Sequence, residues 1–188
     1  MKAGPKQEQG FTLIEVLASI IILSIVSLVL TSYFINAMSY SKSNQNKTIM
    51  VNLARNALFY VEKQDFVKMH DYFITDKHPR IEANNCLPAS SCTSYNTLFS
   101  NTTALAAILN PTVNKVEYHI NIIYQAQLHQ DMLDGKLSES DGAAPDNRKI
   151  EMAPLLIPVQ VEVSGDGGPR GEAYTTVVEG YIIDEKIR

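Results

Sequence analysis

A single carboxylate stands at the start of the longest apolar stretch of the chain. Glu15 is followed by residues 16–41, which contain no charged side chain. An ionisable group in an apolar helix costs on the order of 3 kcal/mol at the centre of a bilayer. The cost is smaller near the helix start, where the group reaches the interface and favours the positive end of the helix dipole. A carboxylate here needs a partner or a function, so Glu15 is the first candidate site residue.

The other reactive residues lack the spacing of a catalytic or metal site. The histidines show no paired ligand spacing such as H-E-x-x-H, and they are His70, His78, His119 and His129. The glycine-rich segment 165–171 lacks the lysine and the following helix of a phosphate loop, so it predicts a hairpin turn. The acidic segment 130–149 predicts a solvated loop and misses the calcium-loop pattern. Its carboxylates are Asp131, Asp134, Glu139, Asp141 and Asp146. We expect no enzyme activity, no cofactor and no metal site.

The average composition hides a strong asymmetry along the chain. The 188 residues have a formal charge of −4 and a mean hydropathy of −0.06, which is typical of a soluble protein. Abundant aromatic and branched residues exclude a disordered chain, and the lack of a second long apolar run excludes a multi-pass membrane protein. The acidic balance does not support DNA as a partner. Basic residues that could form a stripe are nevertheless present: Lys42, Lys47, Arg55, Lys63 and Lys68.

The apolar run predicts one membrane-spanning helix. Its 26 uncharged residues would extend about 39 Å as an α-helix, which is enough to cross a hydrocarbon core of about 30 Å. No glycine or proline interrupts it. Lys2 and Lys6 precede the run, so the positive-inside rule places the N-terminus in the cytoplasm. A cleaved secretory signal or a plain anchor would not account for Glu15.

The segment from Gly10 to Val16, with the sequence GFTLIEV, resembles the processing site of type IV prepilins and pseudopilins. In that family a prepilin peptidase cuts after the glycine on the cytoplasmic side and methylates the new N-terminus. The resemblance implies cleavage after Gly10 and N-methylation of Phe11. It further implies that Glu15 pairs with the N-terminal amine of a neighbouring subunit during assembly. Helix-breaking residues are common in major pilins and absent here, and some pseudopilins bind calcium through acidic loops.

Beyond the membrane, the pattern predicts an α+β head. Ile49, Leu53, Ala57 and Tyr60 or Val61 form an apolar stripe, which extends one helix from Phe11 into the mid-60s with a bend or break near Asp65. Residues 75–111 have loop chemistry, with a short helix at 102–109. Alternating residues at 115–124, 155–163 and 173–183 predict strands, with an edge or bulge at Pro158. The expected fold is a long N-terminal helix packed on a three- or four-stranded antiparallel sheet, which matches the pilin fold.

The two cysteines lie in the segment that this topology places outside the membrane. Cys86 and Cys92 close a short loop, and no histidine neighbours them at ligand spacing. Disulfides persist in that compartment, so we expect a disulfide worth roughly 2 kcal/mol rather than a metal site.

The sequence therefore predicts a structural protein with a leader at 1–10, a transmembrane or filament-core helix at 11–38 and an extracytoplasmic part at 39–188. We expect a minor subunit of a type IV pilus-like filament, first held in the inner membrane and then part of the filament. Implied partners are prepilin peptidase, other pilin or pseudopilin subunits, the inner-membrane assembly platform and the lipid bilayer. Alternatives are a pseudopilin of a type II secretion or competence machine and a membrane-tethered binding or enzymatic domain.

Overall fold

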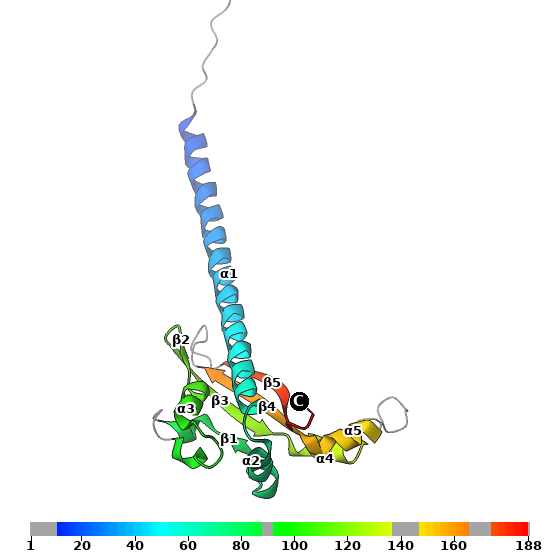
Figure 1. The fold of residues 1–188 in the computed structure, drawn as a ribbon. Coiled ribbons are helices and arrows are strands. Elements are labelled where there is room, and N and C mark those ends of the chain that lie inside the picture. Colours follow the sequence, from blue (N-terminus) through cyan, green and yellow to red (C-terminus); the bar gives the residue numbers. More distant parts are fainter. Residues whose placement is uncertain (1–10, 88–91, 137–146, 166–173, 188) are drawn as a thin grey trace, which may run out of the picture. The chain divides into compact units, whose positions relative to one another are not determined.

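The computed structural model describes residues 11–87, 92–136, 147–165 and 174–187. Contacts divide the chain into two units, Met1–Ser43 and Asn44–Arg188. Helix α1 (Leu13–Glu62) contributes to both (Figure 1). Its residues 13–43 are called the stem below, and residues 44–187 are called the head.

The stem is an uninterrupted helix whose side chains are exposed. Every residue from Phe11 to Lys42 is exposed, and leucines, isoleucines and valines dominate the surface. Three of its hydroxyl groups are satisfied without water. Ser19, Ser24 and Thr31 donate hydroxyl hydrogen bonds of 2.7–2.8 Å to the carbonyl four residues earlier. Backbone acceptors thus satisfy these hydroxyls, which is what a helix in an apolar medium requires. Among the described helices, α1 is the one long and apolar enough to cross a membrane.

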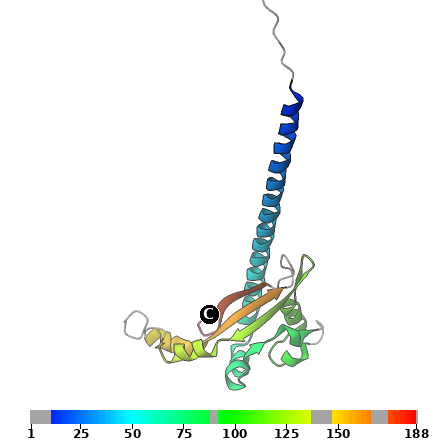
Figure 2. The same ribbon diagram turned by 180° about the vertical axis from the view of Figure 1, so that it is seen from behind.

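The head is built on an antiparallel sheet in the order β1-β3-β4-β5, with β2 also paired to β3 (Figures 1 and 2). Three long strands form its centre, namely β3 (Val116–Tyr124), β4 (Leu156–Gly165) and β5 (Tyr174–Ile183). The remaining strands have two residues each, β1 (Arg80–Ile81) and β2 (Thr112–Val113). The three long strands confirm the strands predicted from alternation. The expected number of three or four strands was too small, because two-residue strands leave no periodic signal.

Pro158 was expected at an edge or a bulge, and this was wrong, since β4 pairs with β3 on one side and β5 on the other. The pairing with β3 ends at Tyr124 opposite Val159, one residue short of Pro158. The Pro158 carbonyl accepts a hydrogen bond from the Gln125 amide just beyond that end. The N–H and C=O of a strand residue point toward the same neighbouring strand. The N–H that Pro158 lacks would therefore point to the β3 side of β4, at a position beyond the end of β3, where no ladder hydrogen bond is lost.

The head portion of α1 packs on one face of this sheet. Its buried residues are Met50, Ala54, Ala57 and Val61. Ala57 and Val61 were in the predicted stripe, and their burial is confirmed. Ile49 and Leu53 are only partly buried, and Met50 and Ala54 are buried in their place, so the buried face is turned there by about one residue.

Small residues on both surfaces account for this rotation. Ala54 and Ala57 are fully buried on the helix side. On the sheet side, a Cβ added to Gly180 of β5 would collide with the Leu58 side chain. The helix thus lies closer to β5 than larger side chains would permit.

The break predicted near Asp65 is confirmed. Helix α1 ends at Glu62, and α2 (Phe66–His70) begins behind Asp65, whose Oδ1 accepts hydrogen bonds from the amides of Val67 at 2.9 Å and Lys68 at 3.3 Å. This N-cap starts the new helix. A π-helical turn, η1 (Asp71–Thr75), continues it. Phe66, Met69 and Phe73 are buried.

The periphery of the head consists of short helical segments. The predicted helix at 102–109 is confirmed as α3 (Thr102–Leu109), capped by the Asn101 side chain. Two 3₁₀ turns, η2 (Ala83–Cys86) and η3 (Cys92–Tyr95), precede it. The loop expected at 130–149 was partly wrong, because α4 (Ala126–Leu133) reaches into it from one side and α5 (Asn147–Met152) with η5 (Ala153–Leu155) from the other.

Side-chain pairs four residues apart explain the helix where a loop was expected. Gln127 bonds Asp131 at 3.0 Å, and Gln130 bonds Asp134 at 2.9 Å, along one turn of α4 each. The Lys136 ammonium lies 2.8 Å from the Asp134 carboxylate. Two of the acidic residues that suggested a solvated loop thus belong to a helix and its end. Glu139, Asp141 and Asp146 lie outside the described residues.

One histidine is buried where α4 meets the end of β3. His129 is 4% exposed, and its Nδ1 lies 2.6 Å from the Tyr124 hydroxyl. Burial lowers the pKa of His129 below its usual value; the Ala153 backbone opposes this, and the charge of His70 adds to it. His129 is therefore held neutral, with its Nδ1 hydrogen-bonded to the Tyr124 hydroxyl.

We predict a pH-dependent loss of stability that His129 causes. A histidine whose folded pKa is lowered binds its proton more readily in the unfolded state. Stability is therefore kept above about pH 6.5, the ordinary histidine pKa, and falls as the pH drops below it. Thermal unfolding of the full chain in detergent, followed by circular dichroism at pH 7.5 and 5.5, should show a lower Tm at pH 5.5. His129→Gln, which keeps an acceptor for Tyr124, should show a smaller drop. An equal drop in both proteins would contradict the assignment.

Candidate functional site

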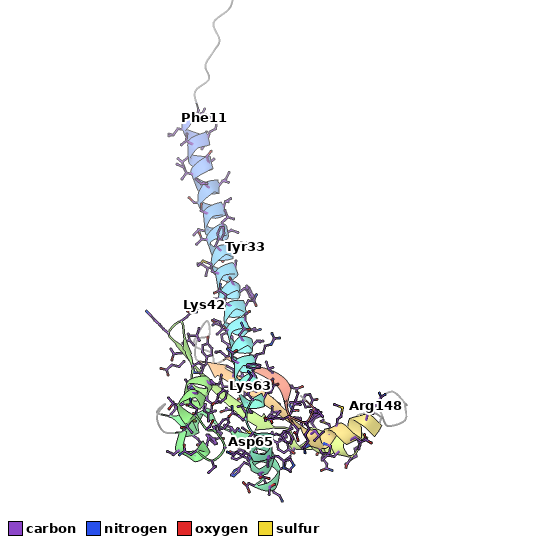
Figure 3. The ribbon with its side chains drawn as sticks, viewed as in Figure 1. Phe11, Tyr33, Lys42, Lys63, Asp65 and Arg148 are labelled. Atoms are coloured by element: carbon purple, nitrogen blue, oxygen red, sulfur yellow. A yellow bond between two sulfur atoms is a disulfide. The ribbon has the colours of Figure 1, made fainter. Side chains whose placement is uncertain are left out.

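The candidate site is the N-terminal end of the stem. Phe11 and Thr12 precede the first residue of α1, Leu13, and the Phe11 side chain is 89% exposed (Figure 3). Glu15 lies in the first turn of the helix. Gly10, the other residue of the predicted processing site, lies outside the described residues.

Thr12 and Glu15 hold each other in a reciprocal cap. Glu15 Oε2 accepts hydrogen bonds from the Thr12 backbone amide at 2.8 Å and from the Thr12 hydroxyl at 2.9 Å. In return, the Glu15 amide lies 3.4 Å from the Thr12 hydroxyl oxygen. Thr12 is thus the N-cap and Glu15 the third helical residue of a capping box, which satisfies amides that the helix start leaves without partners.

The cap changes how Glu15 is explained. Sequence reasoning missed it, although the T-x-x-E spacing that marks a capping box was present. Only one carboxylate oxygen, Oε2, is engaged. Oε1 has no hydrogen bond to another described residue, so it remains available to a donor from outside the chain. The site is a fixed carboxylate at the positive end of a helix dipole, with one oxygen open.

The second predicted pair, Cys86 and Cys92, forms a disulfide. Both cysteines are buried, and they join the end of η2 to the start of η3. The neighbouring Tyr95 hydroxyl accepts hydrogen bonds from the Glu82 amide at 2.8 Å and the Asn85 side chain at 3.0 Å. The disulfide therefore fixes two turns that pack around one tyrosine, which is a structural role.

The basic residues do not form the stripe considered from sequence. Lys47, Arg55 and Lys63 follow one another at intervals of eight residues, so each is rotated by about 80° from the last around α1. The Lys63 ammonium lies 4.2 Å from the centre of the exposed Phe59 ring. A spiral of separated cations is a poor match for a phosphate backbone. In the described part of the chain, histidines, cysteines and carboxylates do not gather in groups of three.

We predict that the Thr12 hydroxyl protects the first turn of the stem. Thr12→Val keeps the shape of the side chain but removes the hydroxyl. Loss of an N-cap costs about 0.5–2 kcal/mol, which corresponds to about 2- to 30-fold faster amide exchange in the first turn. Hydrogen exchange of the full chain in lipid nanodiscs would measure this, with Thr12→Ser as the matched control. Equal exchange in the two variants would show that the hydroxyl does not cap the helix.

Comparison with known proteins adds one match. Residues 5–31 match the prokaryotic N-terminal methylation motif. No curated protein and no solved structure is significantly similar to the chain. The matched range spans Gly10, Phe11 and the Thr12–Glu15 cap and continues into the apolar stem. Residues 5–31 thus carry the signature of type IV pilins and pseudopilins.

Proposed function

We propose that this chain is a structural subunit of a type IV pilus-like filament. It is made as a precursor, cut between Gly10 and Phe11 by prepilin peptidase and methylated on the Phe11 nitrogen. The observation that carries this proposal is the methylation motif at residues 5–31. The local structure supports it, since Phe11 is exposed and precedes the helix, and proteases act on segments outside regular structure.

The stem supplies the surface for assembly. Before assembly its apolar side chains lie in the bilayer, and in the filament they contact the stems of other pilin or pseudopilin subunits. Lipid tails are as apolar as leucine, so this exchange of neighbours gains little hydrophobic free energy. The polar groups of the stem then decide which contacts form. The hydroxyls of Ser19, Ser24 and Thr31 are already satisfied within the helix. Glu15 retains an oxygen for a donor outside the chain.

The donor is the new N-terminus of a neighbouring subunit. Cleavage creates an ammonium group on Phe11, four residues before Glu15 in the same apolar setting. A buried charge without a partner is strongly destabilising, whereas two opposite charges offset one another when they also form hydrogen bonds. Staggered stems bring the Phe11 ammonium of one subunit to the open Oε1 of Glu15 in the next. Thr12 keeps the carboxylate at the helix start, where the neighbour's ammonium arrives.

The proposed processing and assembly of the chain imply its remaining partners. Prepilin peptidase and the assembly platform act on the chain at the inner membrane, with the N-terminus in the cytoplasm and the head outside. The buried disulfide between Cys86 and Cys92 fits an oxidising extracytoplasmic compartment. The sequence predicts a minor subunit, and the abundance of the chain in sheared filaments, detected with an antibody against the head, tests both the filament and the minor role.

We predict that Gly10→Asp leaves the precursor uncleaved. A bulky charged side chain directly before the scissile bond prevents the close approach of the peptidase to the backbone. The intact mass of the membrane form should equal that of the full precursor, whereas the unmodified chain should begin at methylated Phe11. Gly4→Asp, within the leader but away from the bond, is the matched control and should be processed. Cleavage of the Gly10→Asp chain at residue 10 would contradict the assigned site.

We predict that Glu15→Val abolishes filament incorporation without preventing cleavage. Valine removes the partner of the neighbour's ammonium while keeping the stem apolar, so the processed chain should accumulate in the membrane. Ser19→Val, one turn further along the stem, is the control and should still be incorporated. The ratio of filament-bound to membrane-bound chain measures the effect, with an expected loss of at least about 10-fold, or about 1.4 kcal/mol. Normal incorporation of Glu15→Val would refute the pairing mechanism.

A further inference from the structure

Among the described strands, the sheet of the head has one short edge and one long edge. The short edge is β1, whose two residues offer few backbone groups to another strand. The long edge is β5, whose ten residues all pair with β4 in one continuous register (Figures 1 and 2). Proteins usually blunt a long edge with proline, lysine or a bulge. Strand β5 has none of these, so its edge is open to a further strand.

The register identifies the backbone groups of β5 that point away from β4. The Asp184 amide donates to the Leu155 carbonyl at 3.0 Å, one pair beyond the ladder pair of Leu156 and Ile183. Because alternate strand residues direct their N–H and C=O to opposite sides, the even-numbered residues of β5 face β4. The residues between 174 and 182 that face outward are Thr175, Val177, Glu179 and Tyr181. Their amides and carbonyls form no hydrogen bond in the ranges 11–87, 92–136, 147–165 and 174–187.

The pairing on the other side of β4 agrees with this assignment. The Gln125 amide donates to the Pro158 carbonyl at the end of the ladder between β3 and β4, so the even-numbered residues of β4 face β3. The odd-numbered residues of β4 therefore face β5. The ladder joins each of them to an even-numbered residue of β5, as it joins Val161 to Val178.

The side chains along the open edge indicate which strand it would accept. Val177 is 44% exposed and Tyr181 is 40% exposed, on the sheet face away from α1. Glu179 stands between them and forms no hydrogen bond or ion pair with a described residue. On the opposite face, Gly180 lies against Leu58 of α1. Apolar pairs and opposite charges stabilise neighbouring strands, so the favoured strand places a basic residue opposite Glu179 and apolar residues on either side.

We propose that β5 binds an extended segment of another protein, which joins the sheet as an antiparallel strand. The ladders of β4 with its two neighbours are antiparallel, and such pairs are slightly more stable per residue than parallel ones. Backbone hydrogen bonds supply the attraction in strand addition, and alternate side chains supply the selectivity. The bound segment has the pattern apolar-x-basic-x-apolar. This partner of the head goes beyond the proposed filament, because its binding does not require assembly.

A second copy of this chain fits the edge poorly. Two β5 strands that pair antiparallel about Glu179 would place the two Glu179 carboxylates opposite each other, and like charges there are destabilising. A shift of the register by two residues would place each Glu179 opposite Val177, which offers no charge. A partner with a different sequence avoids both problems and agrees with a minor subunit whose neighbours are other proteins.

Hydrogen exchange of the full chain in lipid nanodiscs tests the strand addition. The probe is the peptide TTVTKTVTT with blocked ends, which places lysine opposite Glu179 and valines opposite Val177 and Tyr181. In the free chain, NMR should show fast exchange of the amides of these three residues. Saturating peptide should slow their exchange at least about 10-fold, whereas the amides that face β4 should exchange slowly throughout. Unchanged exchange of the three outward amides would overturn the proposal.

Methylation of the peptide nitrogens shows whether the backbone makes the contact. In an antiparallel ladder the third, fifth and seventh peptide residues direct their N–H groups toward β5. Methylation of these three nitrogens should abolish the protection, whereas methylation of the fourth and sixth should preserve it. Protection by both methylated peptides would show that side chains alone bind and would refute strand addition. Loss of protection only with the fourth and sixth methylated would show a parallel strand and refute the antiparallel one.

Val177→Pro blocks the edge without removing a hydrogen bond of the β4 ladder, since the Val177 amide faces outward. This variant should keep its fold and bind the peptide at least about 10-fold more weakly, measured by fluorescence anisotropy of labelled peptide. Val177→Thr, which keeps the amide, is the matched control and should bind normally. Equal binding by the two variants would contradict the assigned edge.

A charge exchange tests the register independently of how Val177→Pro folds. Glu179→Lys should bind the lysine peptide several-fold more weakly than the unmodified chain does. The same variant should prefer a peptide that carries glutamate in place of the lysine. An unaltered preference for the lysine peptide would refute the pairing at Glu179.

This proposal and the filament proposal fail in distinguishable ways. If the chain does not form filaments, the peptide still protects the outward amides of β5 in nanodiscs. If strand addition is wrong, that protection is absent, while Glu15→Val still blocks incorporation into filaments. A second copy at the edge would protect the same amides without peptide, in a manner that falls on dilution, and this result would also overturn the proposal.

Discussion

The structure depends on one constraint, which is that a carboxylate must be kept in an apolar helix. Glu15 would be costly in lipid without partners, and the chain supplies partners for one of its two carboxylate oxygens. Thr12 supplies two donors to Oε2, and the helix dipole favours a negative charge at this end. The other oxygen stays open. In the filament that we propose, a subunit that satisfied both oxygens would have no reason to prefer a neighbour over lipid, so partial satisfaction would leave the membrane form stable enough to exist and make the assembled form more favourable.

In the head, a small sheet packs against α1, which also continues into the stem. Close packing at Ala54, Ala57 and Gly180 joins α1 to β5, and Asp65 starts a new helix so that the chain leaves the α1 axis. Short helices and one disulfide cover the rest of the sheet.

Elements with a strong periodic signal were predictable from the sequence, and elements set by a few contacts were not. The long strands, α3 and the break at Asp65 follow from alternation, helix-period spacing and local capping chemistry. Part of the buried face of α1 was missed because distant contacts set it, such as that of Leu58 with Gly180, which are 122 residues apart in the chain. Helix α4 was missed because its support comes from side-chain pairs within an acidic segment. At the candidate site, the apolar setting singled out Glu15, whose role in assembly stays a prediction. The T-x-x-E spacing was present but overlooked, so the capping role of Thr12 came from the distances.

The central claim, that Glu15 is shared between the cap of its own helix and the terminus of a neighbour, can be tested chemically. Filaments assembled from equal amounts of ¹⁵N-labelled and unlabelled chain would be treated with a carbodiimide, which joins an amine to a carboxylate in direct contact with loss of water. Mass spectrometry of the digested filaments would then identify linked peptides. The account predicts an amide bond from the Glu15 carboxyl group to the N-terminal nitrogen of a neighbouring subunit. Where the neighbour is a second copy, half of the linked peptides are of mixed isotope content, and where it is another pilin, the peptide linked to Glu15 has that pilin's sequence. A link found only within single-isotope chains, or no link at Glu15 in intact filaments, would contradict it.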